Sequence, residues 1–495
     1  MANKETITYK INNAEFEAKF LLETSGARQG EFGPPDPGQG GDKSIINFSK
    51  SAVRGMDIEE NFLEPFTNGN IYINNPLDFI EDGGLIRGDG GDTFTIEFYD
   101  KSEGEPTNGF AAVAREKKLK YEFVIGSEVN SASQTDRLNN FKIYSLIDKN
   151  YHLLNARIPF GKRYRGKVGD IIKSILVEVL GEDKVTDCLM WDSGDMVIDT
   201  LPEHILPPST FRYSDLIKYL LKLNYKKVGK TYVKLFLNWC RTCQKYQYLP
   251  LSDYFEFAAA EPEELFMAND LIDKVENNPN NPATAPGVTP VNVYNSPLQN
   301  SDLSTPMLTY TNAYLTNMLV SDYDPTLGEH KINVLRIKDI KEEWKKLFVD
   351  KFKYSSGKAQ PWVILNDIKT SEVFRGIGFP FAGDRAKKMA EAELTTNMTF
   401  FNLQLNFSSL GNVAREPGKG IDIAASRPQQ EETGVDHRSD AKLLGTWFIT
   451  KVRHEFNSAK VDGYTNIMQC IKPHIGPGVR VPLDSDLQVN RKSEN

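Results

Sequence analysis

The chain lacks the features that mark secreted and membrane proteins. It contains four cysteines in 495 residues, too few to staple a fold of this size, so we expect it to be made in a reducing cytoplasm. No window approaches the roughly 20 apolar residues that cross a bilayer. The first residues, Met-Ala-Asn-Lys-Glu-Thr, precede no apolar stretch of the signal-peptide kind. We therefore expect a protein that uses neither disulfides nor a membrane.

The motifs of common enzyme classes are also absent. The six histidines are scattered without a His-x-x-x-His pair, and no serine is flanked as a nucleophile elbow. No Gly-x-x-x-x-Gly-Lys-Ser/Thr loop occurs, and no Gly-x-Gly-x-x-Gly opens a helix. The sequence therefore predicts no catalytic, cofactor-binding or metal-ligating residue, no cofactor, and a protein that is not an enzyme.

What the chain does contain favours strands. Hydrophobic residues make up 40% and charged residues 25%, as in an ordinary globular protein. Aromatic residues reach 11%, with 28 Phe and 20 Tyr, and such side chains suit pleated, half-buried strands. The length exceeds what one core supports, so several domains are expected. The net charge of −8 argues against general affinity for nucleic acid.

Alternating apolar residues predict related strands near both ends of the chain. Residues 93–98 alternate with period two, which places Phe94, Ile96 and Phe98 on one buried face. Residues 445–456 alternate in the same way and are followed by a second run of this kind. We therefore predict a small antiparallel barrel at each end of the chain.

The predicted fold is mainly β with α insertions, in which two similar antiparallel β-barrel domains are linked by a mixed α/β domain. The strands of the first barrel are expected near 45–50, 67–74, 93–99, 119–126 and 141–147. The predicted segments are an N-terminal arm and Pro/Gly-rich linker (1–43), the first β-barrel domain (44–156), the mixed α/β domain (157–256), a linker (257–305), the second β-barrel domain (306–480) with a helical insertion at about 338–394, and a tail (481–495).

The mixed domain carries helical periodicity. Residues 168–181 predict a helix that ends at a C-cap glycine, Gly181. A second helix is predicted over 214–223, where apolar residues recur at i, i+3 and i+4. A hairpin-like pair of strands follows at 232–239 and 247–251.

The hairpin contains the pattern Trp-Cys-x-x-Cys of thioredoxin-like active sites, at 239–243. That chemistry needs Cys240 at a helix N-terminus, where its pKa falls, but the surrounding sequence predicts strand and turn. A half zinc site completed by Cys188 or Cys470 has no usual ligand spacing. We interpret Cys240 and Cys243 as small thiols of a hairpin, and leave their state open.

A group of basic residues is spread over the second predicted helix and the hairpin, and it permits two interpretations. It could contact phosphate groups. Two of its members fall on the polar side of an amphipathic helix, and no aromatic-lined nucleic-acid module accompanies it, so an acidic subunit partner is the better interpretation. The group consists of Lys218, Lys222, Lys226, Lys227, Lys230, Lys234, Arg241 and Lys245.

Several short motifs follow one another along the chain in a characteristic order. They are Asn75-Pro76, the Gly-Asp turn at 91–92, the strand 94–98, the run 141–148, Ile205-Leu206-Pro207-Pro208-Ser209-Thr210 before a helix, the strand pair that ends at 248–252, and Gly445-x-Trp447-x-Ile449-x-x-Val452-x-His454-x-Phe456. In this order they resemble the central baseplate hub proteins of contractile-tailed bacteriophages, which are related to the core of type VI secretion spike proteins. The resemblance covers about 44–256 and 306–475.

The resemblance implies a structural hub of a phage tail baseplate. Three copies would form a pseudo-sixfold ring that adapts a sixfold tail tube to a threefold central spike, with a central channel for genome passage. The implied partners are the homotrimer itself, tail tube or tube-initiator proteins, the central spike protein, other baseplate subunits, and DNA in transient, non-specific passage, but no membrane. The implied location is the virion, after assembly in the host cytoplasm.

Two alternatives stay open at the level of sequence. A secretion-type spike core shares the fold, and a fused carboxy-terminal β-helix would favour it, but the tail at 481–495 provides none. A tail-associated cell-wall-degrading enzyme is the alternative from another class. The arm at 29–43, the linker at 257–305 and the insertion near 338–394 exceed a minimal hub, and we expect them to contact further subunits.

Overall fold

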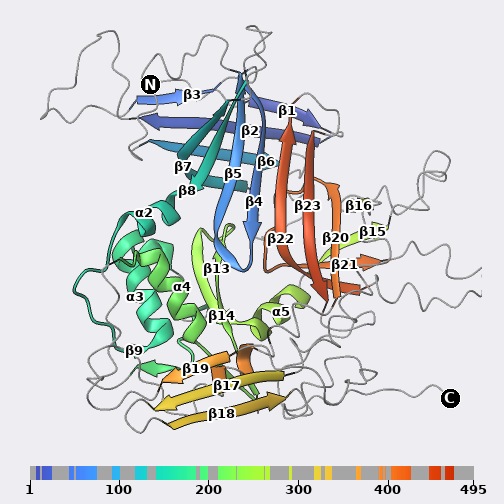
Figure 1. The fold of residues 1–495 in the computed structure, drawn as a ribbon. Helices are drawn as coiled ribbons and strands as arrows, with labels where there is room; N and C mark the ends of the chain where they lie inside the picture. The colour runs from blue at the N-terminus through green and yellow to red at the C-terminus, as the bar shows by residue number, and fades with distance from the viewer. Residues whose placement is uncertain are drawn as a thin grey trace, which may run out of the picture.

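A computed structural model gives the fold (Figure 1). It describes residues 7–11, 14–24, 44–48, 52–74, 92–100, 118–130, 141–185, 190–198, 210–229, 231–260, 262–267, 289–292, 317–324, 329–336, 364–368, 388–389, 391–393, 396, 403–424, 445–458 and 463–472.

Eight strands form the N-terminal module. Their spatial order is β1-β2-β6-β7-β8-β5-β4, with β3 also paired to β2, and every pairing within the module is antiparallel. Alternating apolar side chains from these strands fill one core, which includes Phe20, Phe94, Phe98 and Phe123. The strands are β1 (Ile7–Ile11), β2 (Ala14–Thr24), β3 (Ser44–Asn47), β4 (Val53–Asn61), β5 (Glu64–Asn74), β6 (Thr93–Asp100), β7 (Lys118–Asn130) and β8 (Phe141–Asp148).

Six strands form the C-terminal module. Their pairings run β22-β21-β15-β16-β20-β23 and return from β23 to β22. Strand β15 is parallel to both of its neighbours, and the other pairs are antiparallel. The strands are β15 (Glu263–Met267), β16 (Thr289–Asn292), β20 (Leu403–Leu410), β21 (Gly420–Ala424), β22 (Gly445–Asn457) and β23 (Tyr464–Lys472).

Strands β4 and β22 join the two modules into one sheet. They pair antiparallel from Lys451 with Asn61 to Asn457 with Gly55. In Figure 1 the blue strands β4 and β5 therefore lie directly beside the orange strands β22 and β23. The prediction of a mainly β, antiparallel fold with helices is confirmed. The prediction of two closed barrels is not, because among the described residues no pairing joins β4 back to β2.

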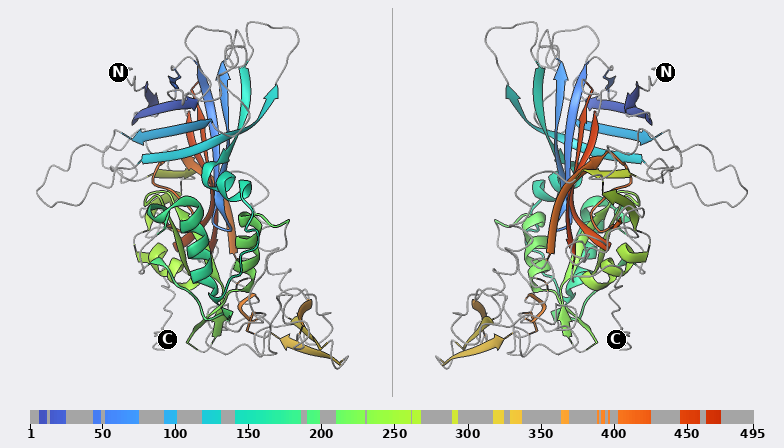
Figure 2. Two further views of the ribbon diagram at one scale, coloured as in Figure 1. Left: turned by 90° about the vertical axis from the view of Figure 1, so that its left-hand side faces the viewer. Right: turned by 90° about the vertical axis from the view of Figure 1, so that its right-hand side faces the viewer.

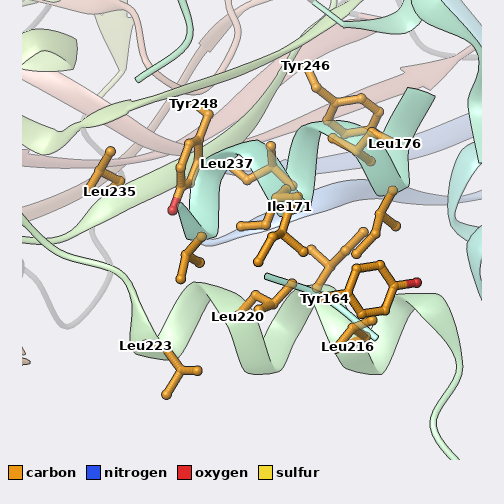
Figure 3. Packing of buried hydrophobic residues seen from close by; sticks show 14 of the residues in the cluster. Tyr164, Ile171, Leu176, Leu216, Leu220, Leu223, Leu235, Leu237, Tyr246 and Tyr248 are labelled. Carbon is orange, nitrogen blue, oxygen red and sulfur yellow. The ribbon is translucent and has the colours of Figure 1, made fainter. Parts of the chain in front are cut away.

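The middle module lies below the N-terminal sheet (Figures 1 and 2). Helices α3 and α4 pack against the β13–β14 hairpin around one apolar core, to which Tyr246 and Tyr248 contribute from β14 (Figure 3). The elements are α2 (Lys149–Ala156), β9 (Gly166–Lys167), α3 (Val168–Leu180), η1 (Glu182–Lys184), β10 (Val197–Ile198), α4 (Tyr213–Leu223), β11 (Lys226–Val228), β12 (Thr231–Val233), β13 (Leu235–Cys240), β14 (Lys245–Pro250) and α5 (Leu251–Ala260).

Both predicted helices of this module are confirmed. Helix α3 buries Ile171, Ile172, Ile175 and Leu176 on one side, as its periodicity predicts. It ends at Gly181, whose φ of 104° favours glycine. No helix among the described residues is long and apolar enough to cross a membrane.

Several predicted boundaries differ from the structure. The range 1–43 holds β1 and β2, and β2 is an interior strand paired to β6, because its apolar residues complete the N-terminal core. The range 257–305 is wrong as a linker, since it holds the end of α5 and the strands β15 and β16. The range 306–480 includes a separate sheet of β17 (Asn317–Asp324), β18 (Glu329–Arg336) and β19 (Ile364–Ile368).

The predicted helical insertion is confirmed only in part. Strand β19 lies within 338–394, while helical backbone occurs at 388–389 and 391–393. Residues 338–352, the Pro/Gly-rich segment 29–43 and the tail 481–495 lie outside the described residues.

Candidate functional site at the junction of the modules

The turn of the β13–β14 hairpin carries an arginine to the junction of the N-terminal and C-terminal modules. Cys240 and Lys245 are the last paired residues, and Gln244 adopts a φ of 54°, so the chain reverses within a short turn. Arg241 follows Cys240 directly and is 2% exposed. A guanidinium this deeply buried must find its partners inside the protein, because it cannot reach water.

Arg241 finds those partners in both flanking modules. Its Nε donates a hydrogen bond to Glu60 Oε1 of β4 at 2.9 Å. Its Nη1 and Nη2 donate to the carbonyl oxygens of Val413 and Arg415, at 2.8 Å each. Burial alone would lower the pKa of Arg241, but the nearby acidic groups, Glu60 first and Glu416 among the others, together outweigh it and the pKa is raised. One cation thus holds the hairpin, β4 and the 411–419 loop together.

Glu60 lies between this arginine and a buried histidine. Its Oε2 atom is 3.5 Å from Nε2 of His454, which is fully buried on β22. Burial raises the pKa of Glu60, but the charge of Arg241 and the neighbouring His454 lower it more, so the carboxylate stays ionised. For His454 the burial dominates and lowers its pKa, so the imidazole is neutral.

The hydrogen bonds around His454 define its tautomer. The Oδ1 atom of Asn466 accepts from Arg415 Nη1 at 3.0 Å, which turns Nδ2 of the same amide toward His454. This Nδ2 lies 2.8 Å from Nδ1 of His454 and donates to it, and Tyr464 Oη lies 2.8 Å from the same nitrogen. Because Nδ1 accepts, the ring proton is on Nε2, where it faces Glu60.

A second buried arginine connects the strands of the C-terminal module. Arg415 is 1% exposed, and its Nε and Nη2 donate to the two carboxylate oxygens of Glu263 on β15, at 2.8 Å each. The same guanidinium donates through Nη1 to the hydroxyl of Ser409 on β20. Paired, parallel hydrogen bonds of this kind fix geometry more strongly than a single contact does. Arg415 therefore links β15, β20 and, through Asn466, β23.

The charged network acts on structure rather than on a substrate. Apart from Glu263, whose side chain is 22% exposed, its groups are between 0% and 5% exposed, so water does not reach them. Removing one partner from such a network leaves an unpaired buried charge, which costs far more than a surface charge. The network thus fixes three modules in one relative position. It consists of Glu60, Arg241, Glu263, Arg415, His454, Tyr464 and Asn466.

The structure rejects a redox role for the Cys-x-x-Cys pair. Cys240 ends a strand and is buried, and the N–H of Cys243 donates to its Sγ at 3.2 Å. The contact with the Cys243 thiol, together with burial, raises the pKa of Cys240, the opposite of an activated thiol. Cys470 lies on β23 and Cys188 lies outside the described residues. In the described part of the chain, no cluster of three or more His, Cys, Asp or Glu residues could hold a metal.

The predicted basic group does not form one exposed surface. Arg241 is buried in the network, so its assignment to a partner surface is wrong. Lys226 forms an ion pair with Asp192, and Lys234 forms one with Glu393. Acidic groups of the chain itself therefore match part of this charge.

The N-terminal and C-terminal modules share one strand order. In each module we label the six common strands a to f in chain order. They are β2, β4, β5, β6, β7 and β8 in the first, and β15, β16, β20, β21, β22 and β23 in the second. The spatial order is a-d-e-f-c-b in both. They differ in the direction of strand a, which is antiparallel to d in the first module and parallel in the second.

The hairpins of strands e and f also share an irregularity. The β7–β8 register shifts between Ile125 and Ser127, and the β22–β23 register shifts between Ile449 and Lys451. Ile125 pairs with Leu146, and Ile449 pairs with Cys470. Ile125 and Leu146 are therefore separated by as many positions in the chain as Ile449 and Cys470 are. A conserved bulge position of this kind indicates a common backbone plan, because a bulge bends and twists its strand.

Comparisons with known proteins found likenesses among solved structures. No protein-family model matches the chain, and no curated protein matches it. A tail protein from Neisseria meningitidis has 11% identity and a TM-score of 0.44, with 92% of this chain and 96% of that chain covered. The 43 kDa tail protein of prophage MuSo2 from Shewanella oneidensis has 9% identity and a TM-score of 0.44, with 92% and 98% covered.

A further similar structure belongs to secretion. It is a component of the type VI secretion system of E. coli, with 9% identity, a TM-score of 0.34, and 87% of this chain and 77% of that chain covered. The structural neighbours are thus tail proteins and a type VI secretion protein. These are the two classes that the order of the sequence motifs resembles.

Proposed function

We propose that the chain is the structural hub of a phage tail baseplate. Three copies form a pseudo-sixfold ring that adapts the sixfold tail tube to the threefold central spike, around a channel for the genome. The observation that carries this proposal is the common strand order of the N-terminal and C-terminal modules, with the same bulge in strand e of each.

A repeated module gives a simple route from threefold to sixfold symmetry. Three copies of a chain with two alike modules present six alike units, while every other feature occurs three times. Heterologous contacts that close after three steps generate such a ring. The helices of the middle module and the sheet β17–β19 lie below the paired sheets (Figure 1), so features that occur once per chain gather toward that end. The sheets would meet the tail tube and the opposite end would meet the spike.

The adaptor needs its two modules at a fixed angle. The chain provides this with the continuous β4–β22 ladder and with the buried ion pair of Arg241 and Glu60, next to the neutral imidazole of His454. Hydrogen-bonded strands resist shear along the whole joint, and buried ion pairs are geometrically demanding. A rigid wall of this kind suits a hub that transmits force during ejection.

The overall charge fits a channel through which DNA passes. With 59 basic and 67 acidic residues, the net charge of −8 disfavours tight binding of a polyanion. The proposed partners are the tail tube or tube-initiator proteins, the central spike protein and other baseplate subunits. The proposed location is the tail baseplate of the virion, after assembly in the host cytoplasm.

Light scattering on the purified full-length chain tests the proposal. The expected mass is three times the chain mass of 55.9 kDa for the chain alone, or this mass plus that of the bound spike protein when the spike is added. Negative-stain images of the same sample should show rings with six similar lobes. A mass of one chain under both conditions would refute the hub. Clearing of host cell walls in a turbidity assay would support the enzyme alternative instead.

A further inference from the structure

A short turn between α2 and β9 presents apolar side chains to solvent. Phe160 is 80% exposed, more than any other large apolar residue in the described part of the chain. Ile158, two positions earlier, is 52% exposed. An aromatic ring beside an aliphatic side chain on one turn is the kind of anchor that protein interfaces use.

The structure holds this turn in one conformation. The N–H of Lys162 donates to the carbonyl oxygen of Pro159 at 3.4 Å, and Gly161 between them has a φ of 72°. The side chain of Lys162 pairs with Glu178 of α3, and Tyr164, directly after the turn, is buried in the core of the middle module (Figure 3). Because the turn is ordered before binding, a partner that takes up the exposed ring does not have to order a loop.

The turn is also strongly basic. From residue 157 to 167 the sequence contains five Lys or Arg residues and no Asp or Glu. Glu178 matches the charge of Lys162. Arg163 and Arg165 are exposed, and neither forms an ion pair with another described residue. The turn therefore combines an apolar tip with a surplus of positive charge.

Helix α5 presents a complementary surface. Phe257 is 49% exposed, and Glu256 beside it is exposed as well. From residue 246 to 273 the sequence contains seven Asp or Glu residues and no Lys or Arg. One of these seven, Glu263, belongs to the buried network. Helix α5 therefore combines an exposed aromatic ring with negative charge.

The two surfaces lie on opposite sides of the middle module. In Figure 1, α2 and β9, which flank the turn, lie on the left of this module, and α5 lies on its right. Helix α5 packs against β14 and against β21 and β22 of the C-terminal module, whereas α2 packs against α3 and α4. The turn of one copy can therefore reach α5 only on another copy.

We propose that the turn at 158–165 binds α5 of the next copy in the ring. Phe160 packs against Phe257, and Arg163 and Arg165 lie opposite Glu256. This interface rests on the proposed trimer and assigns the contact that closes it. Because the two surfaces differ and lie on opposite sides of one module, the contact is heterologous and can close after three steps.

Charge favours a second copy over DNA as the occupant. The phosphate groups of DNA would match the two arginines of the turn, but Glu256 on α5 would repel them. A second copy matches both surfaces at once, since each side contributes an exposed aromatic ring and the charges are opposite. Asp253, at the start of α5, lies near Lys226 of its own chain, so Glu256 is the main acidic group of this contact.

Photo-crosslinking from position 160 tests the proposal. A photoreactive phenylalanine replaces Phe160 in the full-length chain, and trimers are prepared from a mixture of isotopically light and heavy copies. Trypsin releases α5 within one peptide, 246–274, because no Lys or Arg lies between 246 and 273. We expect links from the probe of one copy to this peptide of another. They should be at least about tenfold more frequent than from a probe at Ile467, an exposed residue of β23.

Exchange of the charges tests the same contact without a probe. Replacing both arginines (Arg163→Glu with Arg165→Glu) should raise the concentration at which half of the trimer dissociates by at least about tenfold, because like charges then face each other. Glu256→Arg alone should also weaken the trimer. The combination of all three substitutions should restore most of the loss. Lys222→Glu, at an exposed position of α4, is the control and should change the value less than about twofold.

Light scattering on the same samples separates this proposal from the hub. A trimer in which the probe at position 160 does not reach peptide 246–274 of another copy would overturn the interface and leave the hub standing. Failure of the combined charge exchange to restore the trimer would do the same, as would links only to an added spike protein. A chain that stays monomeric, alone and with the spike protein, would overturn both.

Discussion

Replacing Arg241 with methionine should strongly destabilise the joint between the modules. The substitution keeps most of the side-chain volume but removes the cation. Glu60, which is 5% exposed, then loses its cationic partner and is left as an unpaired buried carboxylate. The carbonyl groups of Val413 and Arg415 lose the hydrogen bonds that Arg241 donates to them. Removing one partner of a buried pair costs about 3–5 kcal/mol. We expect the free energy of unfolding to fall by about that amount.

A neighbouring ion pair provides the matched control. Arg453 on β22 donates to Asp57 on β4 at 2.8 Å, and thus bridges the same two strands, but its side chain is 42% exposed. Exposed pairs contribute about 0–1 kcal/mol, so Arg453→Met should have a small effect. The double variant Arg241→Met with Glu60→Met removes both buried charges. It should recover most of the loss, because no uncompensated carboxylate stays behind.

Urea unfolding followed by tryptophan fluorescence measures all three variants, with proteolysis as a second probe of the joint. The reasoning would be refuted if Arg241→Met cost no more than Arg453→Met. It would also be refuted if the double variant were as unstable as the single one, since unpaired charge would then not be the cause.

Three further predictions follow from single sites. Burial raises the pKa of Asp148 from 3.8 to about 6, so the folded state binds more protons than the unfolded state between these values, and stability should fall by roughly 2–3 kcal/mol as the pH rises through that window. Asp148→Asn should lack this loss in urea titrations at pH 4 and 7. Iodoacetamide at pH 8 should alkylate the exposed Cys243 and spare the buried Cys240 until urea is added, as judged by peptide mass spectrometry. Gly420→Ala should lower the thermal midpoint, with a cost of about 1–3 kcal/mol, because the new Cβ would overlap the carbonyl oxygen of Ala258.

The sequence predicted the elements in which the spacing of apolar residues within the segment itself indicates a helix or a strand. Helices α3 and α4 carry apolar residues at helical spacing, and strands β6, β7 and β8 alternate, so each could be identified without knowing its neighbours. The hairpin of β13 and β14 was found for the same reason. In these segments the period of the apolar residues is enough to show which side chains face the core.

Strand β4 was not predicted, because the partners of its charged residues lie far away in the sequence. Asp57, Glu59 and Glu60 make the segment look like a polar loop. In the structure Asp57 meets Arg453 and Glu60 meets Arg241, which lie 396 and 181 positions away. A single sequence cannot show that a carboxylate will be matched from such a distance. The same holds for β15, whose Glu263 is held by Arg415, 152 positions further on.

Strand β7 lacks the charges by which its counterpart β22 pairs with β4, and this difference can direct the pairing of β4. In the in-chain joint, Lys451 and Arg453 of β22 pair with Glu59 and Asp57 of β4, at 2.7 and 2.8 Å. At the equivalent positions β7 has an uncharged serine and a valine. If β4 of one copy paired with β7 of another, both carboxylates would lose their cations. Specificity of this kind comes from penalising the wrong partner, so charge directs β4 to β22 rather than to β7.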